Sequence, residues 1–320
     1  MTAASLLYTP EGRLRAPIRI GAFLLAAVVG VLVAQTLAYP VASAVARLLG
    51  ARVSAEVWLA ALGLLLAHWL VLHFVERGPV DRRGLATESR GWGYVALDRP
   101  AARPSLLVLG TLLGALAIAL PVGALLLAGW LHVEPAADGS SWEAAWRYTL
   151  LLAPAALWEE LAFRGYLFAV LRESAGDAAA LITTSVLFGL IHFTNPGAEV
   201  RSITLVVLAG FFLGAVVLAT GSLYAAWLAH LAWNWTLGVG FHTAVSGLPF
   251  PAPDYRTVDT GPDWATGGVW GPEGGVTAAL GMGAAVLCLR LWRTRSQGAG
   301  DPTRSRRSRG AGAAGSQRDE

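Results

Sequence analysis

Long apolar stretches alternate with short polar ones along this chain, and their lengths suit membrane-spanning helices. A helix needs roughly 20 mostly apolar residues to cross a hydrocarbon core about 30 Å thick. Eight stretches approach this length, at approximately 18–38, 56–75, 105–130, 142–171, 178–194, 202–219, 222–242 and 276–293. The pattern therefore predicts an all-α fold, a polytopic membrane helix bundle of about eight transmembrane helices.

The composition favours a membrane protein over a soluble domain. Hydrophobic residues make up 55% of the 320 residues and charged residues only 14%, whereas charged residues make up about 25% of a typical soluble domain. The single cysteine, Cys288, excludes both an intrachain disulfide and a cysteine-rich metal site. We expect membrane lipids to surround the bundle, and we expect no nucleic-acid partner.

The positions of the basic residues predict the orientation of the bundle. All 24 basic residues are arginine, and cytoplasmic segments of membrane proteins carry an excess of Lys and Arg. If the N-terminus is cytoplasmic, 18 arginines fall on the inner side of the membrane, five fall on the outer side, and Arg164 lies within the membrane. We therefore predict that both termini are cytoplasmic.

The outer segment between the last two predicted helices, at about 243–275, is unusually long. It is rich in Pro, Gly, Trp and acidic residues. Such a segment can form an ordered cap over the bundle or a mobile loop, and the sequence leaves both open.

The fourth predicted helix contains three charged residues, and charges inside a bilayer cost about 2.5 kcal/mol or more each. Glu160 and Arg164 are four residues apart on one face, so they can pair with each other. Glu159 points about 100° away and has no partner in its own helix. This difference predicts that the Glu160–Arg164 pair maintains the geometry of the site and that Glu159 is the reacting group. The alternative is a buried ion pair that only locks the helix. Pro154 frees the carbonyl of Leu150 and should kink the helix near the site.

Two later helices each contain a polar pair one turn apart. Phe188 and His192 share a face in the fifth predicted helix, and His230 and Asn234 share a face in the seventh. At 1.5 Å per residue, both histidines and Glu159 fall in the middle of the membrane, so they can converge on one water-filled cavity. The other histidines have no accompanying motif, and we interpret them as hydrogen-bonded core or helix-end residues: His68, His73, His132 and His242.

A carboxylate and two imidazoles inside a membrane indicate hydrolysis of an acyl bond. They can bind Zn²⁺ and leave a fourth position open for water. They can also act without a metal, because a carboxylate and one histidine can activate water while the other histidine and an asparagine stabilise an oxyanion. The chain contains neither H-E-x-x-H nor G-x-S-x-G. The residues leave both mechanisms open.

Three short motifs resemble the signatures of a known family. The stretches "EELAFR", "FGLIH" and "HLAWN" are similar to the EExxxR, FxxxH and HxxxN motifs of the CPBP family, the CAAX-prenyl-protease and bacteriocin-processing (Abi) type of intramembrane protease. They occur in the family's order on the fourth, fifth and seventh predicted helices. The resemblance covers about residues 145–242 and implies an intramembrane endopeptidase with eight helices.

The resemblance also implies roles for individual residues. Glu159 and His192 would activate the hydrolytic water, and His230 and Asn234 would form the oxyanion hole. The family is commonly described as metalloproteases, yet a metal-free glutamate mechanism is argued for it as well. If Zn²⁺ is bound, its expected ligands are Glu159, His192 and His230.

The apolar pattern and the composition also predict a domain organisation. Residues 1–295 would form a single transmembrane bundle with its core catalytic region at about 142–242, where Glu160 and Arg164 support the site. Residues 296–320 are rich in Arg and Gly, and we expect a disordered cytoplasmic tail that can lie on anionic lipid.

Two other function classes compete with a protease. Membrane-embedded Glu and His also serve proton-coupled transporters, but no inverted repeat is visible. A non-catalytic membrane scaffold or immunity protein is the third class, but all six motif residues are intact. The chain looks bacterial, where prenylated CAAX proteins are not expected. We therefore expect a peptide or membrane-protein substrate in the bacterial cytoplasmic (plasma) membrane.

Overall fold

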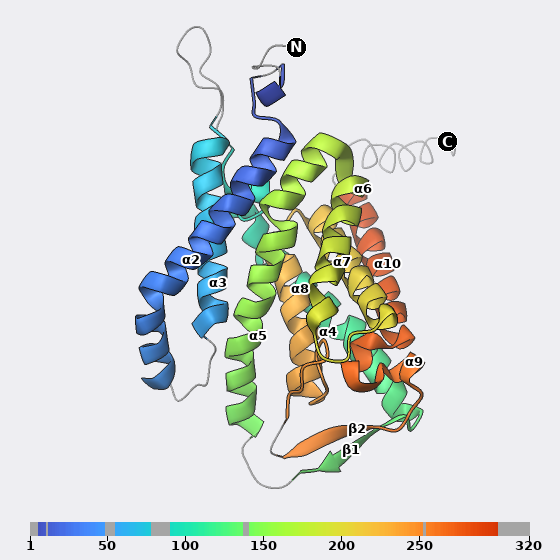
Figure 1. Ribbon diagram of the computed structural model, residues 1–320. Coiled ribbons are helices and arrows are strands. Elements are labelled where there is room, and N and C mark those ends of the chain that lie inside the picture. Colours follow the sequence, from blue (N-terminus) through green and yellow to red (C-terminus); the bar gives the residue numbers. More distant parts are fainter. Residues whose placement is uncertain are drawn as a thin grey trace, which may run out of the picture.

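The computed structural model describes residues 6–10, 12–48, 55–77, 90–136, 141–251 and 254–299. Within these residues, eight helices of 13 residues or more form a bundle (Figure 1). They are α2 (Ala16–Leu48), α3 (Ala55–Leu70), α4 (Pro104–Leu127), α5 (Ser141–Arg164), α6 (Tyr166–Ile191), α7 (Val200–Thr220), α8 (Leu223–Trp235) and α10 (Val276–Ala299).

The predicted all-α membrane bundle is confirmed, with changes at the helix ends. The described residues contain six helical segments that are long and apolar enough to cross a membrane, and one of them, Trp142–Thr194, covers α5 and α6 together. Helix α8 is too short to be among them, but the π-helical turn Thr236–Gly240 extends it. The predicted tail lies outside the described residues from position 300 onward, and α10 continues to Ala299.

Non-helical backbone at Gly176 divides α6 into two parts that run in opposite directions. The first part continues the direction of α5, and the second returns through the bundle. Helix α2 begins and helix α10 ends at the same end of the bundle, the upper end in Figure 1. This arrangement is the one expected if both termini lie on one side of the membrane, and the assignment of that side to the cytoplasm stays a prediction.

The described part of the outer segment is an ordered cap at the opposite, lower end in Figure 1. Its strand β2 (Tyr255–Asp259) pairs in antiparallel register with β1 (Leu131–Pro135), which follows α4. The short helices α9 (Asp263–Thr266), Gly268–Trp270 and Pro272–Gly274 come next. The indole of Trp270 is only 1% exposed, which shows that the cap is packed rather than loose.

Small residues bring α4 and α8 into close contact. A Cβ on Gly110 would lie 2.2 Å from the carbonyl oxygen of Ala225, and one on Gly114 would lie 1.9 Å from that of Ala229. Glycines four residues apart allow this backbone approach between membrane helices. The contact fixes α8, which also begins with a cap: Ser222 Oγ accepts a hydrogen bond from the Ala225 N–H at 3.0 Å.

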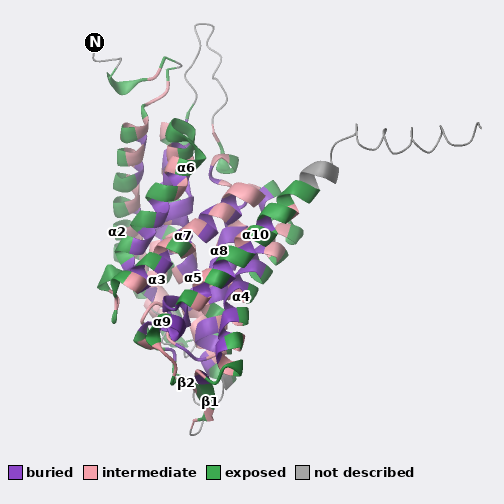
Figure 2. Cartoon of the chain, turned by 90° about the vertical axis from the view of Figure 1, so that its right-hand side faces the viewer, coloured by how far each residue is buried: buried purple, intermediate pink, exposed green. Residues whose placement is uncertain are grey.

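The buried surfaces of the helices face one another and their exposed surfaces face outward (Figure 2), and many of the exposed side chains are large and apolar. Large exposed side chains such as Leu25, Leu37, Leu120 and Leu280 are more than half exposed. In water such a surface would favour association, whereas in a bilayer it contacts lipid tails. This distribution is the one expected of a membrane-spanning bundle.

A group of charged and phenolic side chains, some buried and some partly exposed, lies near the upper end. This upper cluster consists of Arg19, Glu76, Arg90, Tyr94, Tyr166 and Glu173. Arg19 donates from Nε to Glu76 at 2.7 Å, from Nη1 to Glu173 at 2.9 Å and from Nη2 to the Tyr94 hydroxyl at 2.6 Å. Tyr166 donates a hydrogen bond to Glu76, and Arg90 forms a bidentate ion pair with Glu173. The cluster ties α2 and the end of α3 to α6.

Candidate active site

Helix α5 carries three of the predicted site residues on its last two turns. Pro154 lies inside this helix, and it leaves the carbonyl oxygen of Leu150 without its helical partner. That oxygen accepts a hydrogen bond from Trp58 Nε1 of α3 at 3.0 Å. A neighbouring helix therefore satisfies the group that Pro154 frees, and α5 continues as far as Arg164.

Gly165 separates α5 from α6, so the prediction of one continuous helix over 142–171 was wrong. Its backbone is not helical, with φ −83° and ψ −125°, and a Cβ there would lie 2.2 Å from His68 Nε2. That nitrogen accepts a hydrogen bond from the Tyr166 N–H at 3.1 Å, while His68 Nδ1 donates to Leu64 O at 2.7 Å. His68 is thus a hydrogen-bonded core histidine, as predicted, and it stabilises the start of α6.

Glu160 and Arg164 form the predicted ion pair within one helix face. Arg164 Nη1 lies 3.2 Å from Glu160 Oε1, and both side chains are fully buried. Arg164 Nη2 also donates to the carbonyl oxygen of Gly210 on α7 at 3.2 Å. The guanidinium lies 4.2 Å from the centre of the Phe188 ring, in cation–π contact. The pair thereby links α5 to α6 and α7.

Glu159 stays outside this pair and faces two imidazole rings. Its Oε2 lies 3.7 Å from Nε2 of His230 and 4.0 Å from Nε2 of His192. Both separations are longer than a hydrogen bond. Among the described residues, this buried oxygen has no hydrogen-bond partner. The carboxylate is therefore held near both rings but is not bonded to either.

Both histidines turn Nε2 toward Glu159 because Nδ1 is engaged elsewhere. His192 Nδ1 donates to the carbonyl oxygen of Phe188 at 2.7 Å. His230 Nδ1 lies 3.0 Å from Glu160 Oε1. A carbonyl or an ionised carboxylate can only accept, so Nδ1 carries the hydrogen in both rings. In a neutral ring Nε2 then offers a lone pair to the space beside Glu159.

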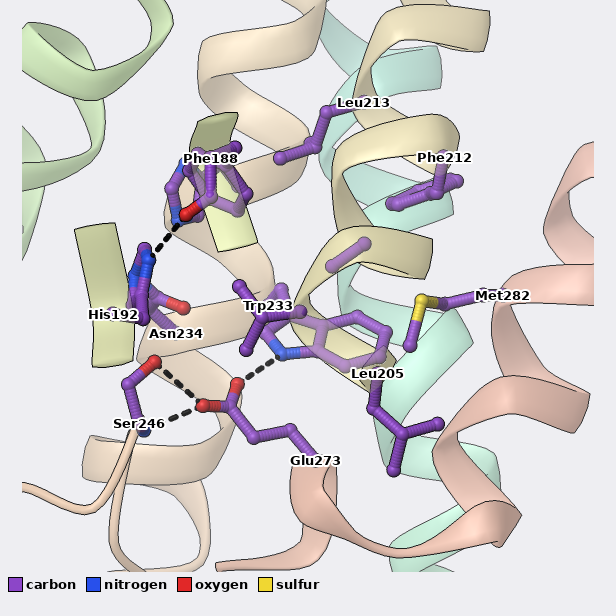
Figure 3. Close-up of a pocket in the computed structure, with 13 residues that line it drawn as sticks. Phe188, His192, Leu205, Phe212, Leu213, Trp233, Asn234, Ser246, Glu273 and Met282 are labelled. Atoms are coloured by element: carbon purple, nitrogen blue, oxygen red, sulfur yellow. Dashed lines mark hydrogen bonds between the residues drawn. The ribbon is translucent and has the colours of Figure 1, made fainter. Parts of the chain in front are cut away.

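A small cavity of about 30 Å³ adjoins the histidines (Figure 3). His192, His230 and Asn234 all line this cavity. The structure therefore brings Asn234 close to the two histidines. Most of the other lining side chains are apolar, and they come from α6, α7, α8 and α10: Phe188, Leu205, Val206, Ala209, Phe212, Leu213, Trp233 and Met282. The arrangement places polar groups at one side of an apolar space.

Two polar residues that the sequence did not single out also line the cavity. They are Ser246 and Glu273, and both belong to the outer segment. Figure 3 shows the Glu273 carboxylate between the Trp233 indole and Ser246. Neither residue lies in a recognisable motif, so the acidic character of the outer segment was the only signal that could have suggested them.

The donor set of Glu159, His192 and His230 suits zinc in kind, and its spacing is somewhat wider than that of ligands on one zinc ion. Two ligands on one tetrahedral zinc ion, each at about 2.0–2.1 Å, lie roughly 3.4 Å apart. The carboxylate oxygen lies 3.7 and 4.0 Å from the two nitrogens. Within the described ranges, no three His, Cys, Asp or Glu side chains are arranged to hold a metal ion.

A comparison with protein-family models places the site in a known context. Residues 141–236 match the model described as type II CAAX prenyl endopeptidase Rce1-like. The matched region contains all six residues singled out by the motifs and ends just after Asn234. No curated protein and no solved structure matches the chain.

Proposed function

We propose, on the premise of the match between residues 141–236 and the Rce1-like CAAX endopeptidase model, that this chain is an intramembrane endopeptidase that cleaves a peptide bond with a water molecule activated by Glu159 and His192. One observation carries the proposal. Oε2 of Glu159 is buried, faces two imidazole nitrogens and, among the described residues, accepts no hydrogen bond. A general base needs such a free, desolvated oxygen.

The geometry between Glu159 and His192 supports the activation of water. A water molecule that hydrogen-bonds to two acceptors at about 2.8 Å each fits between Oε2 and Nε2, which are 4.0 Å apart. Glu159 takes a proton as the water oxygen forms its bond to the substrate carbonyl carbon. When the carbon–nitrogen bond breaks, Glu159 returns that proton to the leaving amine. The products are a carboxylic acid and an amine.

His230 and Asn234 are the proposed oxyanion donors. They lie one turn apart on α8 and border the same cavity as His192. The side-chain amide of Asn234 can donate directly. His230 uses Nδ1 toward Glu160, so it can donate from Nε2 only when both ring nitrogens are protonated. Donors fixed before the reaction stabilise developing charge without reorganisation.

Glu160 and Arg164 are proposed to orient this machinery rather than to touch the substrate. Glu160 accepts from both His230 and Arg164. It therefore fixes the rotation of the His230 ring, and Arg164 keeps Glu160 in place through its own contact with Gly210. Partners of this kind are what set the tautomer and the orientation of a functional histidine.

The proposal is tested by loss of a cleavage product. We expect the purified protein to cleave a peptide or membrane-protein substrate and the Glu159→Ala and His192→Ala variants to lose this activity. Comparative proteomics of membrane fractions from cells with wild-type protein and with Glu159→Ala should reveal an uncleaved species in the variant. Full activity in either purified variant would contradict the assignment of the site.

The metal-free form of the mechanism has a separate test. We expect cleavage to survive treatment with a membrane-permeant chelator, because the water contacts Glu159 and His192 directly. Activity that disappears with the chelator and returns with Zn²⁺ would replace this mechanism with a zinc-dependent one.

A further inference from the structure

Glu273 is a buried carboxylate that the proposed reaction does not use. It lies in the short helix Pro272–Gly274 of the outer segment, and it is 8% exposed. Its Oε2 accepts a hydrogen bond from Trp233 Nε1 at 2.8 Å. Its Oε1 accepts from the Ser246 N–H at 2.5 Å and from the Ser246 hydroxyl at 2.7 Å (Figure 3). Three donors thus hold this carboxylate in one orientation.

The donors to Glu273 connect it to both histidine-bearing elements of the site. Trp233 is on α8, immediately before Asn234 and three residues after His230. Ser246 accepts, through its carbonyl oxygen, a hydrogen bond from Asn195 Nδ2 at 2.9 Å. Asn195 directly follows the short helix His192–Thr194 that carries His192. A continuous chain of hydrogen bonds therefore runs from the end of α6 through the outer segment to α8.

The outer segment is also seated closely on the chain that follows His192. A Cβ on Gly247 would lie 2.0 Å from the carbonyl oxygen of Pro196, so the two backbones touch. Gly247 N–H donates to Trp270 O at 3.0 Å, and Trp270 is buried. Movement of this segment would therefore move the end of α6 with it.

We propose that Glu273 is a positioning residue of the active site, which holds the His230 and Asn234 side of α8 at a fixed distance from His192 by way of Trp233, Ser246 and Asn195. This inference rests on the proposed endopeptidase function. The outer segment is then a structural part of the active site and not only a cap. Oxyanion donors act at full strength only when they are held within about 0.5 Å of their productive position.

Substitution of Glu273 by glutamine tests the proposal with little change in shape. The amide has one acceptor oxygen and one NH₂ group, so at least one of the three donors faces another donor. We expect kcat to fall about 10–100-fold, as is typical when an outer partner of a site is lost, while KM stays unchanged. Glu134→Gln is the matched control, because Glu134 lies in the same cap but forms only an exposed pair with Arg256.

A double variant separates positioning from general destabilisation. Trp233→Phe removes the indole N–H that would face the new amide, so Trp233→Phe/Glu273→Gln should be no slower than Glu273→Gln alone. If the fold-losses in kcat of the two single variants multiply in the double variant, the two residues act independently and the coupling is refuted. A kcat that is unchanged, or that falls only in proportion to the folded fraction, would also overturn the proposal.

Hydrogen exchange provides a readout that does not depend on activity. We expect Glu273→Gln to increase amide exchange in residues 192–197 and 228–236, and Glu134→Gln to leave both unchanged. If the wild-type protein cleaves no substrate and exchange still increases at both places, the proposed function fails while the structural coupling stands. If exchange does not increase in Glu273→Gln, the coupling itself is refuted.

Discussion

Two groups of charged side chains lie between the helices of this bundle, and they differ in how fully the hydrogen bonds of their buried atoms are satisfied. In the upper cluster, among the described residues, no buried nitrogen or oxygen lacks a partner. In the active-site group, three buried atoms lack one within the described part of the chain: Glu159 Oε2, Glu160 Oε2 and Arg164 Nε. The two groups also differ in burial, because the side chains of Arg90 and Glu173 in the upper cluster are 21% and 34% exposed whereas those of Glu160 and Arg164 are fully buried.

The difference indicates two uses of buried charge. A saturated network such as the upper cluster joins α2, α3 and α6, and every bond that it makes offsets part of the cost of removing its charges from water. An unsatisfied carboxylate oxygen gains nothing of that kind for stability. It remains available to a water molecule or a substrate, which is what a reacting group requires. The comparison therefore predicts that isosteric changes in the two groups affect different quantities.

The largest effect is expected from Glu159→Gln. Loss of the general base should lower kcat about 10²–10⁴-fold, while the unfolding temperature in detergent stays near that of the wild type, because Oε2 accepts no hydrogen bond among the described residues. Cleavage kinetics and a thermal unfolding curve on the same sample check both parts. A large drop in unfolding temperature would show that Glu159 stabilises the fold as the upper cluster does, and it would contradict the proposed difference between the two groups.

Arg164→Ala should affect both quantities, because it removes the partner of a buried carboxylate that also orients His230. We expect a loss of about 3–5 kcal/mol in the free energy of unfolding and a reduced kcat in the protein that still folds. Arg172→Ala is the control, since Arg172 forms an exposed pair with Asp177 and exposed pairs contribute little. Equal yields of folded protein from the two variants would contradict the structural role of Arg164.

Glu76→Gln is the counterpart of Glu159→Gln in the upper cluster. Glu76 is 2% exposed and accepts from Arg19 and Tyr166. Removal of its charge should lower the free energy of unfolding by about 3 kcal/mol and leave kcat per folded molecule unchanged. Denaturation curves and activity normalised to folded protein measure the two. A selective loss of kcat would show that the upper cluster also supports catalysis.

The smallest expected effect is a pH dependence at Tyr94. Burial raises the pKa of the Tyr94 phenol, and its hydrogen bond to Glu173 raises it further. A folded pKa above the unfolded value of about 10 means that this contribution to stability is complete below pH 10 and is lost as pH rises above it. Unfolding temperatures between pH 8 and 11 should fall less steeply above pH 10 in Tyr94→Phe than in the wild type. Equal slopes would exclude Tyr94 as the titrating group.

Helix existence could be predicted from the sequence more reliably than helix ends. Each apolar stretch is a helix because a bilayer requires its backbone groups to bond internally. The ends depend on neighbours: α5 stops at Arg164, and His68 of another helix accepts the N–H of Tyr166, two residues later. Likewise, the carbonyl freed by Pro154 finds its donor on Trp58. Such partners are distant in sequence, and no local sequence pattern predicts them.

The spacing of the candidate residues within each helix could be predicted from the sequence, but their surroundings could not. The four-residue spacings of Glu160 with Arg164 and of His230 with Asn234 follow from helix geometry alone, and the structure places these pairs as expected. The upper cluster was not predicted. Arg19 and Arg90 were already explained by the excess of arginine expected on the cytoplasmic side. Glu273 escaped prediction because a single acidic residue in a long loop has no periodicity that assigns it a partner.

The sequence by itself determined the membrane class, the approximate helices and the residues that carry the proposed chemistry, because those depend on hydrophobic length and on spacing within one helix. Only the tertiary structure decided that, among the described residues, Glu159 Oε2 is left free between two rings, that the described part of the outer segment is ordered, and that Glu273 is tied to both histidine-bearing elements. These are contacts between segments far apart in the chain. Their geometry is set by packing, as where Gly110 and Gly114 bring α4 against α8, and packing is a property of the whole bundle.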